Sequence, residues 1–249
     1  MLSAIAFVPS APVMVPELAT GAASELRDLV AAVRAAAAEL PERWFVVGTG
    51  PADNVIGPGA VGTFGGYGAD VQVALSPRAA GEPKALPLCA LIAGWVRTTG
   101  APEASAEVWV YAADHEPDAA LARGRALRAE VDAISEPVGV LVVADGANTL
   151  TASAPGGDAP ESVPVQAALD DALSIGDAVA LTRLPDAIVG RVAYQVLAGL
   201  TGPSPSAARE LYRGAPYGVG YSVGVWTPAP TGRGSAPAGR SEANGEFTE

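Results

Sequence analysis

One short polar segment contains the single histidine of the sequence. Asp114-His115-Glu116 follows the apolar run Glu107–Ala112, which reads as a β-strand. An imidazole titrates near neutral pH, so His115 is a candidate general acid or base. Consecutive residues at a strand end point in different directions, and these three therefore do not form a ready triad. A surface histidine at a strand end is the alternative interpretation.

Other polar residues follow apolar runs in the same way. They are Ser10, Asp53, Asn54, Asp145 and Asn148, which come after the runs Leu2–Val8, Trp44–Gly48 and Val138–Val143. Parallel strands end at one edge of a sheet, where open α/β folds bind their ligands. We therefore predict that Ser10, Asn54, His115 and Asp145 line one cleft, with Asp53, Asp114 and Asn148 as further pocket residues. Separate turns, such as an Asx turn at Asp145, are the alternative.

The metal-binding residue types are sparse. One histidine cannot form a two-histidine iron or zinc centre, and scattered carboxylates could hold Mg²⁺ or Ca²⁺ only weakly. We assign no metal ligand. Cys89 is the one cysteine, which excludes an internal disulfide, and its place in the apolar run Ala85–Val96 predicts a buried thiol.

A glycine-rich segment, Gly57-Pro-Gly-Ala-Val-Gly62, matches the dinucleotide-binding pattern by its letters. Its surroundings do not match, because Pro58 interrupts it and more glycines follow where a helix should begin. We interpret this segment as a turn-rich loop.

Apolar strands alternate with amphipathic helices in the first half of the chain. This pattern predicts an α/β fold with a mostly parallel central sheet and helices on both faces. The helices expected in this half are Glu17–Leu40, Leu86–Val96 and Asp118–Ile134. One further strand is expected at Asp70–Leu75. The second half predicts helices at Val163–Leu173, Ile175–Leu181, Pro185–Leu200 and Ala207–Tyr212, then a strand at Tyr217–Trp226.

The composition limits the domain plan and the partners. We expect one α/β domain over residues 1–228 and a disordered tail over 229–249, where almost no apolar residue occurs. The net charge of −12 makes nucleic acid and anionic membranes poor partners. No transmembrane span or signal peptide is expected, so we predict a cytoplasmic protein. A homo-oligomer or a protein partner stays open.

Several segments together resemble the LigB-type class III extradiol ring-cleavage dioxygenases. The resemblance covers nearly all of residues 1–228. The segments that carry it are Val8–Glu17, Asp53-Asn54, Asp114–Leu127, Val140–Asn148 and Ala187–Leu200. It implies the family's α/β fold, a catechol-type substrate, and a non-haem Fe(II) bound by two histidines and one glutamate.

The sequence departs from that family at the metal ligands. Ser10 stands at the first histidine position, Asn54 at the second, and Val189–Val192 where the glutamate is expected. His115 stands where the family has an acid–base histidine that does not bind the metal. The resemblance therefore implies a ligand-binding or interaction module that has lost Fe(II)-dependent catalysis, with no cofactor and a small aromatic molecule as candidate ligand.

Two alternatives remain. The first is a metal-independent hydrolase that uses His115 with Asp114, Asp145 or Ser10. The second is an active class III extradiol dioxygenase acting on a catechol-type aromatic, whose missing ligands come from a partner chain or from other residues of this chain.

Overall fold

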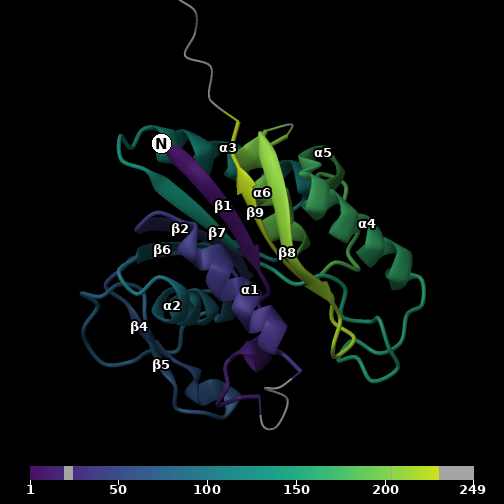
Figure 1. The fold of residues 1–249 in the computed structure, drawn as a ribbon, viewed down its shortest axis with the longest axis horizontal. Helices are drawn as coiled ribbons and strands as arrows, with labels where there is room; N and C mark the ends of the chain where they lie inside the picture. Colours follow the sequence, from purple (N-terminus) through teal and green to yellow (C-terminus); the bar gives the residue numbers. More distant parts are fainter. Residues whose placement is uncertain (20–24, 203, 230–249) are drawn as a thin grey trace, which may run out of the picture.

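A seven-stranded sheet forms the centre of the computed structural model, which describes residues 1–19, 25–202 and 204–229 (Figure 1). Its strand order is β3-β6-β2-β7-β1-β9-β8. The strands are β1 (Leu2–Val8), β2 (Arg43–Gly50), β3 (Asn54–Ile56), β6 (Ser105–Ala112), β7 (Val138–Val143), β8 (Ala207–Gly214) and β9 (Tyr221–Thr227). A separate two-stranded sheet pairs β4 (Val61–Thr63) with β5 (Gln72–Ala74).

The central strands run parallel and the outer strands run antiparallel. β6, β2, β7 and β1 form the parallel part, in which Ile5 pairs with Val140 and Val8 with Val143. β3 joins β6 antiparallel at one edge, while β9 and β8 continue antiparallel beyond β1. The α/β class is therefore confirmed, with a mixed rather than wholly parallel sheet. All six residues of β7 are buried, as expected for a strand covered on both faces.

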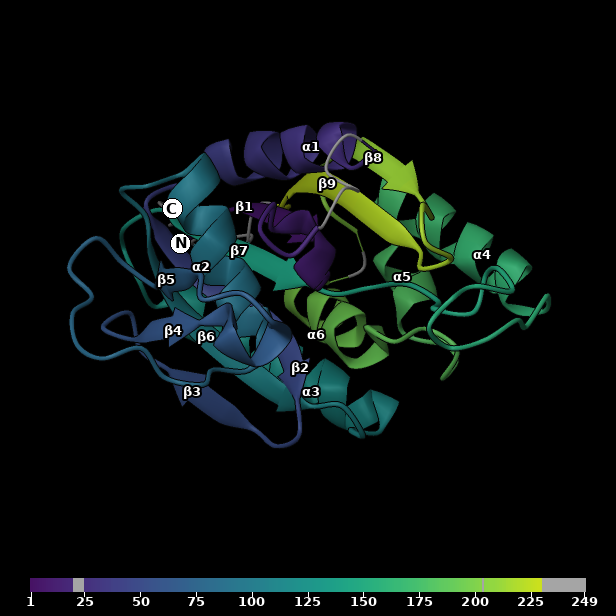
Figure 2. The same ribbon diagram turned by 90° about the horizontal axis from the view of Figure 1, so that it is seen from below.

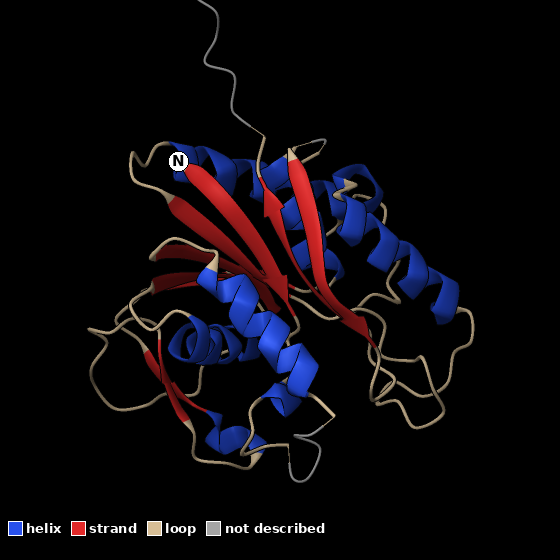
Figure 3. Cartoon of the chain, viewed as in Figure 1, coloured by secondary structure: helices blue, strands red, loops and turns tan. Residues whose placement is uncertain are grey.

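Helices cover both faces of the sheet (Figures 2 and 3). One face packs against α1 (Arg27–Ala38) and α2 (Leu88–Gly100), whose apolar residues share one buried cluster with Val46 and Leu141. The other face packs against α3 (Pro117–Asp132), α4 (Ser162–Ile175), α5 (Ala178–Leu181) and α6 (Arg191–Thr201). Two short 3₁₀ helices, η1 (Pro12–Met14) and η3 (Phe64–Tyr67), lie in the connecting loops.

Helices α3 and α6 touch backbone to backbone through two glycines. A Cβ added at Gly124 would lie 2.1 Å from the carbonyl oxygen of Val196, and one at Gly199 would lie 2.2 Å from that of Leu121. Only glycine permits this approach without moving a helix. The two helices therefore fix each other's position, which matters because each begins beside a candidate site residue.

One predicted helix is wrong. Ala207–Tyr212 has good helix-forming residues, but it lies in β8, which pairs with β9 from Ala207–Thr227 to Gly214–Tyr221. The hairpin turn contains Gly218 with φ of 71°, a conformation that suits glycine. Cross-strand pairing here overrides the local helix propensity.

Other boundaries also differ from the expectations. The helix expected over Glu17–Leu40 spans only Arg27–Ala38, and the one expected over Pro185–Leu200 begins at Arg191. Ile175 ends α4, and Gly176, with φ of 78°, separates it from α5. Asn54 opens strand β3 instead of lying in a loop. The expected disordered tail lies outside the described residues, apart from Ala229.

Within the described ranges, no helix combines the length and the apolar character that a bilayer span needs.

Candidate functional site

The four parallel strands send their connections to alternating faces of the sheet. The chain leaves β1 and β2 toward α1 and α2 on one face, and leaves β6 and β7 toward α3 and α4 on the other. In the order β6-β2-β7-β1, each pair of neighbours therefore diverges at its carboxyl ends. Such divergence opens crevices where α/β proteins bind ligands.

The first polar group at this edge is the Asp53 cluster, which consists of Asp53, His115 and Arg123. The Nε2–H of His115 donates to Oδ1 of Asp53 at 2.7 Å, and the backbone N–H of Ala112 donates to the same oxygen at 2.8 Å. The other carboxylate oxygen lies 2.9 Å from Nη2 of Arg123. Burial opposes the charge, but these N–H groups and cations outweigh it and lower the pKa of Asp53. Asp53 is thus an ionised anchor that orients the imidazole.

Arg191 joins the first turn of α6 to this cluster. Its Nη1 donates to the carbonyl oxygen of His115 at 3.2 Å and to Oε1 of Gln195 at 3.1 Å, and its Nε lies 3.1 Å from a carboxylate oxygen of Asp186. Only 14% of the Arg191 side chain is exposed. Gln195 is fully buried, and its Nε2 has no hydrogen-bond partner among the described residues.

The second polar group is the pair Ser10 and Asp145, at the ends of β1 and β7. The backbone N–H of Ser10 donates to Oδ1 of Asp145 at 2.8 Å. Burial raises the pKa of Asp145 to about 7, and the Ser10 N–H only partly offsets this effect. A carboxyl group with this pKa exchanges a proton near neutral pH, as functional carboxyls often do.

The N-terminal end of α6 also lies against the Asp145 segment. The N–H of Gly190 donates to the carbonyl oxygen of Asp145 at 2.8 Å, and the hydroxyl of Tyr194 donates to that of Ala144 at 3.1 Å. A Cβ at Gly190 would lie 2.6 Å from the Cβ of Ala144. Because Arg191 contacts His115 in the same turn, α6 links the two polar groups.

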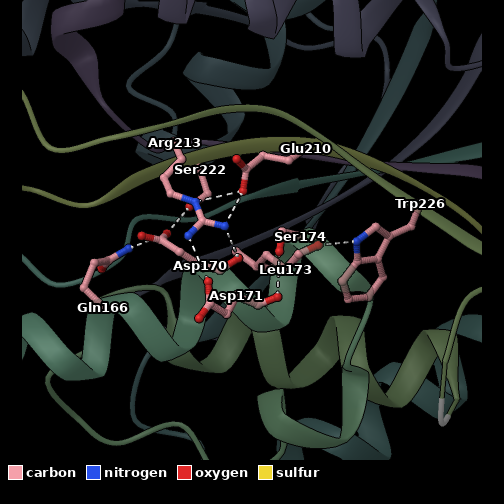
Figure 4. A network of polar contacts seen from close by, with 9 residues as sticks. All are labelled: Gln166, Asp170, Asp171, Leu173, Ser174, Glu210, Arg213, Ser222 and Trp226. Atoms are coloured by element: carbon pink, nitrogen blue, oxygen red, sulfur yellow. Dashed lines mark hydrogen bonds and ion pairs between the residues drawn. The ribbon is translucent and has the colours of Figure 1, made fainter.

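A buried polar network braces the loop that carries Asp145 (Figure 4). Oε1 of Gln166 accepts the N–H of Ala147 at 2.8 Å, and its Nε2 donates to Oδ1 of Asp170 at 2.8 Å. Ser222 donates to the same Asp170 oxygen at 2.7 Å, and Arg213 donates to the Asp170 carbonyl at 3.3 Å. Burial raises the pKa of Asp170 despite these hydrogen bonds. The network ties α4 to the β8–β9 hairpin.

The contacts join the predicted site residues in two pairs. Asp53 contacts His115, and Ser10 contacts Asp145. That Ser10, Asn54, His115 and Asp145 line one cleft stays a prediction. Asn54 lies on the edge strand opposite Val110. The remaining two predicted pocket residues are Asp114, in an exposed turn, and Asn148, whose carbonyl accepts the N–H of Gly156 at 2.9 Å.

Three residues of this site were not predicted. Arg123, Arg191 and Gln195 lie on helices, and only their side-chain contacts place them beside His115 and Asp53. Arg123 lies in the second turn of α3 and Arg191 in the first turn of α6, and no local sequence pattern marks either as a site residue.

A cavity of about 260 Å³ opens beside Asp53, between α3 and the strands β3 and β6. Trp109, Tyr111 and Leu127 give it apolar walls, while Asp53, Arg123 and Glu130 are the charged residues of its lining. The Trp109 ring stacks on Phe45, with centroids 6.3 Å apart and planes inclined by 28°.

The residues at this edge do not fit the iron that the family resemblance implies. Ser10 and Asn54 stand where the resemblance places the two histidines. They offer a hydroxyl and an amide, and both of these groups are weak ligands for Fe(II). His115 directs Nε2 to Asp53. In the described ranges, no three side chains of the types His, Cys, Asp and Glu come together as a metal-binding group.

Comparisons with known proteins show a similarity of fold and nothing more specific. No protein-family model and no curated protein match the sequence. The fold is similar to the crystal structure of the uncharacterized protein JW3007 from Escherichia coli K12, with a TM-score of 0.52 and 11% sequence identity. The similarity covers 90% of this chain and 98% of that one.

Proposed function

We propose that this chain is a ligand-binding protein with a fold like that of the extradiol dioxygenases, that it has lost Fe(II)-dependent catalysis, and that it binds a small aromatic molecule at the carboxyl edge of the sheet. One observation carries the proposal. Asp53, which is hydrogen-bonded to His115 and paired with Arg123, lines with that arginine a 260 Å³ cavity whose walls include Trp109 and Tyr111.

The cavity wall favours a flat ring as the ligand. Trp109 is half-buried, with one part against Phe45 and another at the cavity, so a bound ring can stack on it or meet its edge. The volume of about 260 Å³ lies just below the usual range of ligand pockets, about 300–1,000 Å³, which favours a small molecule.

The charged residues of the cavity lining favour an acidic or phenolic substituent on that ring. Arg123 carries a fixed positive charge, and its guanidinium presents several N–H donors although one of its nitrogens already contacts Asp53. Asp53 supplies an ionised acceptor for a hydroxyl. A hydroxylated aromatic acid satisfies both groups.

Binding of 3,4-dihydroxybenzoate, measured by calorimetry or NMR titration, tests the proposal. Cyclohexanecarboxylate is the non-aromatic probe and should bind more weakly. Arg123→Gln and Trp109→Leu should each weaken binding of the dihydroxybenzoate by about tenfold, as expected when a charged hydrogen bond or an aromatic contact is lost. Arg125→Gln, an exposed arginine on the same helix, is the matched control.

Two results would contradict this function. The first is saturable binding that neither variant weakens beyond the Arg125→Gln control. The second is equal affinity for the aromatic and the non-aromatic probe.

The Asp53–His115 hydrogen bond also favours a second candidate function, a metal-independent hydrolase. A carboxylate 2.7 Å from an imidazole nitrogen is the arrangement that orients a general base. The contact of Ser10 is a backbone N–H bond to Asp145, and no hydrogen bond within the described residues joins Ser10 to His115, so a water molecule would be the nucleophile that His115 activates. Turnover of aryl esters or phosphate esters that His115→Gln abolishes would support this function and displace the first.

A further inference from the structure

A second cavity lies at the opposite edge of the sheet. It has a volume of about 730 Å³, and its lining includes Arg43 and Ser105, the first residues of β2 and β6. These two residues pair in the sheet register, whereas the candidate site lies beyond the other ends of the same strands. The volume falls within the usual range of ligand pockets, about 300–1,000 Å³.

Backbone hydrogen bonds fix the walls of this cavity to one another. The N–H of Ser105 donates to the carbonyl of Glu42 at 2.7 Å, and the N–H of Ala106 donates to that of Leu75 at 2.7 Å. The buried side chain of Arg97 donates to the carbonyls of Ala74, at 2.8 Å, and Pro102. The segments around residues 42, 75 and 104 therefore form a preformed pocket.

The glycine-rich loop that resembles a dinucleotide motif supplies another wall. Pro58 and Gly59 line the cavity, and no atom lies within 4 Å of a Cβ added at Gly59. The loop is held by the N–H of Leu75, which donates to the carbonyl of Ala60 at 3.0 Å. Its open face leaves room for a ligand, although it opens no helix that could bind a pyrophosphate.

The charges on the walls include both signs. Arg43 is already paired with Glu136 at 3.1 Å and lies over the Phe45 ring. Arg78, Glu42 and Glu103 line the cavity without an ion-pair partner among the described residues. Glu42 and Glu103 come from neighbouring chain segments, whereas Arg78 comes from the loop after β5.

A buried hydroxyl adds to these groups. Ser76 lines the cavity and is 7% exposed, and none of the hydrogen bonds within the described residues uses its side chain. Ser76 can therefore donate to a ligand atom next to Arg78.

We propose that this cavity binds a zwitterionic ligand of the amino acid class with an apolar side chain. Glu42 and Glu103 receive the ammonium group, and Arg78 with Ser76 receives the carboxylate. The apolar side chain lies against Pro58 and Pro77. A ligand of one charge only would leave one of the two charged walls without a partner.

Three related probes test this assignment by calorimetry: L-phenylalanine, phenethylamine, which lacks the carboxylate, and 3-phenylpropanoate, which lacks the ammonium group. Phenylalanine should bind at least about tenfold more tightly than either fragment, because each fragment loses a charge-assisted hydrogen bond. Arg78→Gln should weaken phenylalanine binding by about tenfold and leave phenethylamine binding unchanged. Glu103→Gln should weaken binding of both amines and spare 3-phenylpropanoate.

Arg125→Gln, at an exposed position of α3 that does not line this cavity, is the control and should change none of these affinities. Circular dichroism checks that each variant is folded. Absence of phenylalanine binding to the unaltered protein overturns the proposal, and so does equal binding of all three probes. Because these residues are absent from the Asp53 cavity, failure here leaves the proposed function untouched.

Discussion

Replacing Asp145 with asparagine should stabilise the protein, and more so at higher pH. Asparagine keeps the Oδ1 atom that accepts the Ser10 N–H, so the change removes the ionisable proton and little else. Burial raises the folded-state pKa of Asp145 to about 7, from a usual value of 3.8. The folded protein thus holds this proton more tightly than the unfolded chain does.

The size and direction of the effect follow from that difference. Stability falls as pH rises wherever the folded state binds more protons, here by about 1.4 kcal/mol for each pH unit between 3.8 and about 7. Relative to a side chain that does not titrate, the raised pKa of Asp145 therefore costs about 1.6 kcal/mol at pH 5 and about 4.4 kcal/mol at pH 8. Below pH 3.8 the carboxyl is neutral in both states and the cost disappears. The nearest titratable groups, Tyr194 and Tyr221, have pKa values raised by burial and by the Asp145 charge, so they stay neutral over this range.

Urea unfolding followed by tryptophan fluorescence at pH 5 and pH 8 measures this effect. The gain of Asp145→Asn over the unaltered protein should increase by about 2.7 kcal/mol between the two pH values. Taking the difference between the two proteins cancels the titration of other groups. Asp114→Asn, at an exposed turn, is the control and should show no such increase. A gain that is the same at both pH values, or a loss of stability at pH 8, would refute the reasoning.

Three further predictions concern packing and metal content. Gly124→Ala should lower the free energy of unfolding by about 2 kcal/mol or more, because its Cβ would overlap the α6 backbone. Thermal unfolding compares this variant with Gly66→Ala, where the space around the added Cβ is open. Equal melting temperatures of the two variants would contradict the prediction. Gln166→Ala should cost about 2 kcal/mol in urea unfolding, because it leaves the buried N–H of Ala147 without a partner and removes one of the two side-chain hydrogen bonds to Asp170. Exposed Gln72→Ala should cost almost nothing. After anaerobic incubation with Fe(II) and desalting, elemental analysis should find no stoichiometric iron; a content of about one iron atom per chain would argue for the dioxygenase alternative.

The strands with continuous apolar sequence could be predicted to the residue. β1 and β7 span Leu2–Val8 and Val138–Val143 as expected, because β1 from Ile5 to Val8 and all of β7 are buried, and burial on both faces requires an apolar run. The exposed edge of the sheet could not be predicted. β8 carries Arg209, Glu210 and Arg213, and its half-exposed pattern allows a helix equally well until β9 is placed beside it.

The pairing of site residues could not be predicted either. The sequence places Ser10, Asp53, His115 and Asp145 after strands. It does not show which of these strands are neighbours in the sheet. The order β6-β2-β7-β1 decides that Asp53 meets His115 and that Ser10 meets Asp145, 135 residues away in the chain. Arg123 and Arg191 enter through helix packing, which no local pattern encodes.

The position of β1 between β7 and β9 has a consequence for biosynthesis. β1 is translated before both of its neighbours, and β9 is the last strand of the sheet to be made. A nascent chain therefore carries an apolar strand with unpaired edges until residues 221–227 have emerged from the ribosome. Chains that terminate before β9 should accordingly be prone to aggregation or dependent on chaperones, whatever the stability of the finished fold.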